Sequence, residues 1–194
     1  MGQNYLENIK NRVFRVPMGF ESVTKHSATN SPTMADRPTI VSEASPFFQF
    51  EQDFITGLRC IPMVVRYRLD RVGIKLKLHH WNQLSEADRL RLVLAPCDTL
   101  PEQETYRQEL RELVAARSGE IPKDLPLENP FPWLSADLPD SVAAQAARVG
   151  VTVSHQQWRS LSELQRFALI KLSQPGHENR NFLPAVQEFG LLSP

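Results

Sequence analysis

The sequence lacks the features that mark several protein classes. Its 194 residues include only two cysteines, Cys60 and Cys97, and neither belongs to a CxxC or CxxH motif. A disulfide framework is therefore excluded, and we expect a reducing, cytoplasmic compartment. No apolar run approaches the ~20 residues of a membrane-spanning helix, and the first residues show no signal-peptide pattern. We expect no association with a membrane.

Catalytic and cofactor-binding motifs are also missing. The sequence contains no GxGxxG, no Walker loop, no GxSxG and no HExxH. These motifs position phosphates, nucleophiles or metal ions, so their absence favours a protein that is not an enzyme and has no bound cofactor.

The net charge of zero hides two stretches of opposite sign. Residues 57–97 hold eight basic and three acidic side chains, a net charge of +5. Residues 98–140 hold four basic and ten acidic side chains, a net charge of −6. The two stretches could face each other or could each face a partner, and solvated helix surfaces are the simpler interpretation.

What the sequence does contain is an internal repeat. Residues 71–93 and 148–170 align without a gap at an offset of 77, with 9 of 23 positions identical. The identical positions include Trp81/Trp158 and Arg89/Arg166. We expect a duplicated unit of helix, glycine stop, tryptophan-bearing turn and capped helix, packed about a pseudo-twofold axis. Both tryptophans should be core residues, and each arginine should pair with a carboxylate or a helix C-terminus.

Helix signals dominate the rest of the chain, so the sequence predicts an all-α fold. Residues 45–194 should form a single helical domain. Residues 1–44 are rich in Ser, Thr, Asn and Pro and should form a disordered N-terminal tail. Met34 is an alternative start, because the residues after it read as an ordinary N-terminus.

Several local features can be predicted. Phe47, Phe50, Phe54 and Leu58 recur at helical spacing and predict one apolar helix face. Ser85, Thr99 and Ser162 are expected N-caps. Five prolines within residues 120–139 predict an extended connector without a helix.

The adjacent His79 and His80 precede Trp81. Neighbouring residues on a helix point to different sides, and the second repeat has Gln156 and Gln157 at the matching positions. The pattern therefore favours two solvated side chains over a metal site.

A second candidate metal site comprises Cys60, Cys97 and His177 with an acidic group, if the fold brings them together. Their spacing matches no zinc or iron–sulfur motif. The sequence favours two structural cysteines.

The segment PGHENRNFLP, residues 175–184, concentrates hydrogen-bonding groups at a helix break. Two interpretations stay open. One is a polar recognition loop made of His177, Glu178, Asn179, Arg180 and Asn181. The other is a capping turn with Asn181 as the N-cap of a helix over Phe182–Phe189.

Two long stretches resemble the nitrate-reductase-associated protein family of cyanobacteria. They are FFQFEQDFITGLRCIPMVVRYRLDRVGIKLKLHHWNQLS, residues 47–85, and LQRFALIKLSQPGHENRNFLPAVQEFG, residues 164–190. The resemblance covers roughly residues 46–191 and supplies no catalytic residues.

The resemblance implies a small cytoplasmic accessory protein that is required for active assimilatory nitrate reductase. That reductase is a molybdopterin enzyme with an iron–sulfur cluster, and its apoprotein is the expected partner. The family's sequence blocks then predict the docking face: Arg59, Cys60, Pro62, His177, Glu178, Asn179, Arg180 and Asn181.

Two other functions remain as alternatives. The first is a metallocofactor carrier that binds an iron–sulfur unit or a metal through Cys60, Cys97 and His177. The second is a helical DNA-binding regulator of nitrogen assimilation. A symmetric reader of DNA should carry basic residues on both halves, and the second repeat lacks most of those in the first, so binding of nucleic acid is disfavoured.

Overall fold

The computed structural model describes residues 45–192. The predicted tail, with Met34, lies outside the described residues, as do the side chains of Phe54, Thr56, His177 and Glu178. The described part is mostly helical, which confirms the predicted fold class. Its one sheet is a two-stranded antiparallel ladder that pairs Ile74 with Asp124 and Lys75 with Lys123.

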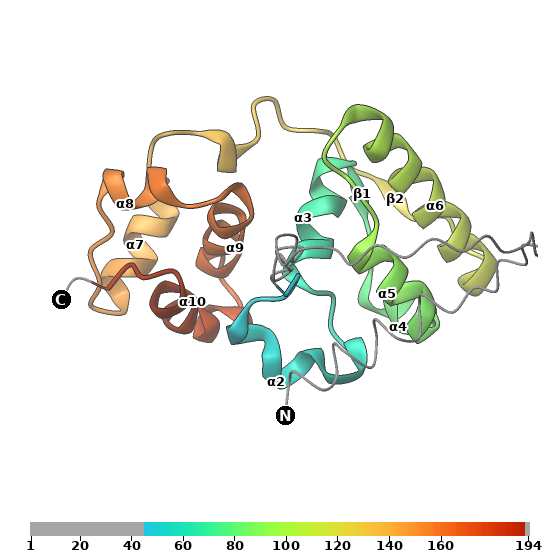
Figure 1. Cartoon of the computed structure of the whole chain (residues 1–194), viewed down its shortest axis with the longest axis horizontal. Helices are drawn as coiled ribbons and strands as arrows, with labels where there is room; N and C mark the ends of the chain where they lie inside the picture. Colours follow the sequence, from blue (N-terminus) through green and yellow to red (C-terminus); the bar gives the residue numbers. More distant parts are fainter. Residues whose placement is uncertain (1–44, 193–194) are drawn as a thin grey trace, which may run out of the picture. The chain divides into compact units, whose positions relative to one another are not determined.

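The elements follow one another in two groups, which Figure 1 shows with the connector between α6 and α7 passing from one to the other. The first group is η1 (Gln49–Glu51), α2 (Gln52–Ile55), η2 (Thr56–Leu58), α3 (Met63–Arg71), β1 (Ile74–Lys75), α4 (Leu78–Gln83), α5 (Glu86–Leu94), α6 (Leu100–Ser118) and β2 (Lys123–Asp124). The second is η3 (Pro132–Leu134), α7 (Asp140–Arg148), α8 (His155–Ser160), α9 (Glu163–Ser173), η4 (His177–Asn181) and α10 (Phe182–Glu188).

Helix α9 is central to a hydrophobic core that includes residues of α3, η3, α7 and α10. It packs against α3, α7, α10 and η3, and its side chains Phe167, Leu169 and Leu172 are fully buried. Tyr67 on α3 and Trp133 in η3 contact Phe167 edge to face, with ring centroids 5.4 and 5.1 Å away. The contact between α3 and α9 therefore joins the two groups of helices.

No described helix combines the length and the apolar character that crossing a membrane requires.

The helix starts follow local rules. The side chains of Ser85, Thr99 and Ser162 accept hydrogen bonds from the backbone N–H three residues on, as predicted. The long helix α6 ends at Gly119, which adopts the left-handed conformation that favours glycine at this position.

The two repeats have matching elements. The helices α3 and α7, and likewise α4 and α8, begin and end at residues that differ by 77, and α5 and α9 begin at residues that do so. Trp81 and Trp158 are both fully buried, and their Nε1–H groups donate to Leu58 O and Ser135 O, each 23 residues earlier. The predicted pseudo-twofold arrangement of the two units stays a prediction.

The repeated arginines bind helix C-termini, one of the two expected partners. Arg89 donates to Trp81 O and Asn82 O at the end of α4. Arg166 donates to Trp158 O and Arg159 O at the end of α8. Each guanidinium also lies over the ring of its tryptophan, at 5.9 and 5.7 Å.

The two oppositely charged stretches partly face each other. Helix α6 packs against α4 and α5, and ion pairs cross this contact between Arg91 and Glu109 and between Lys77 and Glu120. Part of the charge asymmetry is therefore used within the fold.

Three local expectations were wrong wholly or in part. Residues 47–58 do not form one regular helix: η1, α2 and η2 follow one another over 49–58, and the positive φ angles of Gly57 (76°) and Leu58 (49°) end the helical backbone there. The connector contains the 3₁₀ turn η3, in which the buried Trp133 inserts into the core. Asn181 stands at the N-cap position of α10, but its side chain makes no capping hydrogen bond, because Asn181 is itself helical and η4 runs directly into α10.

Gly73 and Gly150, at matching repeat positions, give a matched test. Both have positive φ, but a Cβ at Gly73 would lie 2.7 Å from Leu125 O, whereas a Cβ at Gly150 meets nothing within 4 Å. Each alanine variant should lose about 1–2 kcal/mol from backbone strain. Gly73→Ala should lose at least about 1 kcal/mol more from the clash, measured by urea unfolding. Equal losses of unfolding free energy in the two variants would show that the segment around Leu125 shifts to make room for the added methyl group.

Candidate functional site

The two sequence blocks that carry the family resemblance, residues 47–85 and 164–190, meet at the segment η1. Glu51 is only 1% exposed, and its carboxylate accepts hydrogen bonds from Met63 N at 2.8 Å and Phe48 N at 3.3 Å. Glu51 thereby attaches η1 to the first turn of α3, directly after the segment LRCIP.

The helix α10 also contacts this segment. Glu188 on α10 accepts from Gln49 N at 2.7 Å and from Phe50 N at 3.0 Å. The rings of Phe48, Phe50 and Phe189 form an aromatic cluster with centroids 5.0–6.2 Å apart. Segments more than 130 residues apart are thus joined through η1.

The predicted docking residues near α3 differ in exposure. Arg59 is exposed and Cys60 is half-buried, whereas Pro62 is buried as the N-cap of α3. Arg59 and Cys60 therefore present side chains to solvent, and Pro62 holds the backbone that carries them.

The predicted docking residues near α10 lie in the turn η4. Arg180 is exposed, and Asn179 and Asn181 are half-buried. The Oδ1 atom of Asn179 is buried and has no hydrogen-bond partner among the described residues. The side chains of His177 and Glu178 lie outside the described part. The two interpretations of this segment, a recognition loop and a capping turn, therefore both stay predictions.

The buried Glu51 predicts a pH-dependent stability. Burial raises its pKa from 4.5 to about 7, against the lowering effect of the Met63 and Phe48 hydrogen bonds. Between pH 4.5 and 7 the folded chain therefore binds a proton that the unfolded chain has released, so the stability contributed by this group falls as pH rises. The fall should amount to about 3 kcal/mol.

Glu51→Gln removes this titration while keeping an acceptor for Met63 N. The free energy of unfolding of wild type relative to the variant should decrease by about 3 kcal/mol from pH 4 to pH 8. Urea unfolding of both proteins at the two pH values measures it. A difference that does not change with pH would contradict the assignment.

The two cysteines do not form a metal-ligand group in the described part of the chain. Cys60 is half-buried and Cys97 is buried, and burial raises the pKa of the Cys97 thiol. A raised pKa disfavours the thiolate that binds metals. The third member of the predicted group, His177, has no described side chain.

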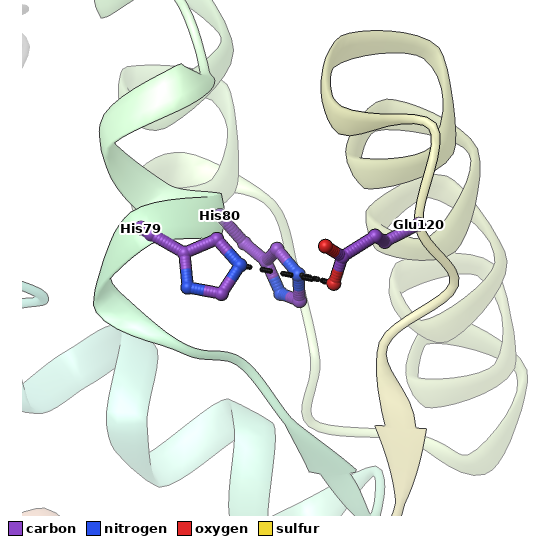
Figure 2. Close-up of side chains that lie close together, drawn as sticks. All are labelled: His79, His80 and Glu120. Atoms are coloured by element: carbon purple, nitrogen blue, oxygen red, sulfur yellow. Dashed lines mark hydrogen bonds and ion pairs between the residues drawn. The ribbon is translucent and has the colours of Figure 1, made fainter.

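A different cluster does have metal-ligand geometry: His79, His80 and Glu120, shown in Figure 2. Within the described residues, this is the only set of three His, Cys, Asp or Glu side chains whose ligand atoms all lie within 4.8 Å. His80 Nε2 is 2.9 Å and His79 Nε2 is 3.7 Å from Glu120 Oε2.

This cluster corrects the interpretation of the histidine pair. His80 is 2% exposed rather than solvated, and the two rings contact each other edge to face, 4.1 Å apart. They occupy the first turn of α4, and both reach the carboxylate that follows α6. The sequence could not reveal this, because Glu120 is 40 residues away and belongs to no motif.

The surroundings of Glu120 favour its charged form. The hydrogen bond from His80 lowers the pKa of Glu120 most, and the nearby Lys77 ammonium lowers it further. At neutral pH Glu120 is therefore a negatively charged carboxylate beside two imidazoles, and its oxygen can serve as a metal ligand.

Two open grooves flank α3. One, of about 470 Å³, includes Asp70, Phe131, Trp133 and Lys171 among its lining residues. The other, of about 510 Å³, includes Tyr67, Arg71 and Cys97. Neither was predictable from the sequence, because each combines residues from distant segments.

Residues 47–189 match the family model of the conserved nitrate reductase-associated protein. The chain belongs to this family. The matched range spans every described helical element from η1 to α10. No curated protein and no solved structure matches the chain significantly. The family's description associates its members with nitrate reductase, and the blocks that meet at η1 lie within the matched range except for Gly190.

Proposed function

We propose that this chain is a non-catalytic accessory factor that binds the apoprotein of assimilatory nitrate reductase and supports its maturation. The observation that carries the proposal is the family match over residues 47–189. The sequence adds that no motif for nucleophilic, phosphate or metal catalysis is present.

The docking face in this proposal comprises Arg59, Cys60 and Pro62, which precede α3, together with residues 177–181 of the turn η4. The buried carboxylate of Glu51 and the half-buried carboxylate of Glu188 support it, because they attach η1 to α3 and to α10, the elements next to these two segments. Exposed arginines are common at the energetic centres of protein interfaces, and Arg59 and Arg180 are both exposed.

The structure gives an argument against the DNA-binding alternative. Basic side chains in residues 57–97 make contacts within the fold: Arg68 donates to Leu92 O and Val93 O, Arg71 donates to Asp98 O, and Arg89 caps α4. A nucleic-acid surface needs such groups directed toward phosphates.

Co-purification tests the proposal against the carrier alternative. The full chain, tagged, would be produced in a nitrate-grown cyanobacterial host, and its partners and iron and sulfide content determined. We expect reductase in stoichiometric amount and no iron or sulfide on the separated chain. An iron–sulfur spectrum on the separated chain would instead support a carrier, and absence of reductase would contradict the proposal.

A further inference from the structure

The cluster of His79, His80 and Glu120 has a ligand set that the proposed function does not use. Two imidazoles and one carboxylate are the nitrogen and oxygen donors that bind Zn²⁺ and related divalent ions. The histidines come from the first turn of α4, and Glu120 directly follows Gly119, which ends α6. Figure 2 shows both imidazole rings facing the Glu120 carboxylate, where the dashed contacts meet.

The two distances from Glu120 lie near those expected around a bound ion, and all three ligand atoms lie within 4.8 Å of one another. Around an ion with bonds of about 2.0–2.1 Å, tetrahedral ligand atoms lie about 3.3–3.4 Å apart. The two distances from Glu120 Oε2, 2.9 Å to His80 and 3.7 Å to His79, fall on either side of this value. The side chains of His79 and Glu120 are 50% and 55% exposed, so both can turn to complete the geometry.

The burial of His80 is a second observation. Its ring is 2% exposed, yet Nδ1 has no hydrogen-bond partner among the described residues and Nε2 has only Glu120. Buried polar atoms in native proteins rarely lack partners, and an unseen ion is one explanation when they do. A metal ion at Nε2 would give this buried imidazole a second partner beside the exposed carboxylate, while Nδ1 would stay unpartnered.

We propose that His79, His80 and Glu120 bind a divalent transition-metal ion of the Zn²⁺ class, with a fourth coordination position open to water or to a partner's side chain. The site is separate from the cysteines and does not depend on the proposed function. Lys77 should weaken binding of the metal ion, because its ammonium group lies 3.8 Å from Glu120 Oε2 and repels a cation.

Zn²⁺ titration of the untagged full chain, by competition with a chromophoric chelator, tests the site. We expect one equivalent to bind, with affinity at least about 10-fold lower in Glu120→Gln and in His79→Ala, since each loses one of three ligands. Lys77→Met should bind more tightly than wild type. These positions are exposed, so the variants should fold, and circular dichroism would verify it.

Two matched controls remove the same groups elsewhere. Glu104→Gln changes an exposed carboxylate on α6, and His155→Ala removes an exposed imidazole on α8. Both should bind Zn²⁺ as wild type does. The proposal is overturned if wild type binds no better than Glu120→Gln, or if the controls weaken binding as much as the site variants.

Discussion

Charge reversal of Arg59 and Arg180 together should abolish, or weaken at least about 30-fold, the binding of nitrate reductase apoprotein. The proposed docking face includes these two exposed guanidinium groups, one in the segment before α3 and one in η4. Glutamates there would place negative charge against groups that accept from arginine, and such like-charge contacts cost about 2 kcal/mol or more. Pull-down of the apoprotein and reductase activity in cells measure the loss.

A matched variant distinguishes this effect from a general change of charge. Lys123→Glu with Arg148→Glu makes the same change at exposed positions in β2 and α7. It should bind the reductase and activate it like wild type. Equal losses in both double variants, or none in either, would place the docking face elsewhere.

Trp81→Ala and Trp158→Ala should each lower the free energy of unfolding by about 3–5 kcal/mol, the usual cost of deleting a buried tryptophan side chain. Both rings are fully buried, both donate to a backbone carbonyl, and both lie under a capping arginine. Such losses are a large part of the 5–15 kcal/mol that stabilises a typical domain.

The conservative variants Trp81→Phe and Trp158→Phe keep most of the buried area and serve if the alanine variants do not fold. They should lose about 1–3 kcal/mol, because a buried carbonyl loses its donor. Trp81→Phe should lose less, since Leu58 O also accepts from Arg89 at 3.2 Å. Guanidinium unfolding measures all four variants. A loss below about 1 kcal/mol at either tryptophan would show that it is not a core residue in solution.

Features that depend on neighbouring residues could be predicted from the sequence. The caps at Ser85, Thr99 and Ser162 and the stop at Gly119 are set by side chains within one turn of the helix end. The burial of both tryptophans followed from their repetition, because a duplicated unit keeps its core residues.

Features that depend on distant residues could not be predicted. The helical spacing of the phenylalanines before Leu58 suggested one helix, but Phe48 and Phe50 pack against Phe189 from the far end of the chain. Likewise His79 and His80 are brought to Glu120 by the packing of α4 on α6. Long-range packing therefore outweighed local pattern at η1 and at the histidine cluster.

The most direct test of the account is binding between the purified full chain and purified reductase apoprotein, measured by sedimentation velocity. The account predicts a stoichiometric complex with a Kd near or below about 10 μM. If the two proteins sediment separately at concentrations about 10-fold higher, the chain does not act by binding the reductase, and the central claim is wrong.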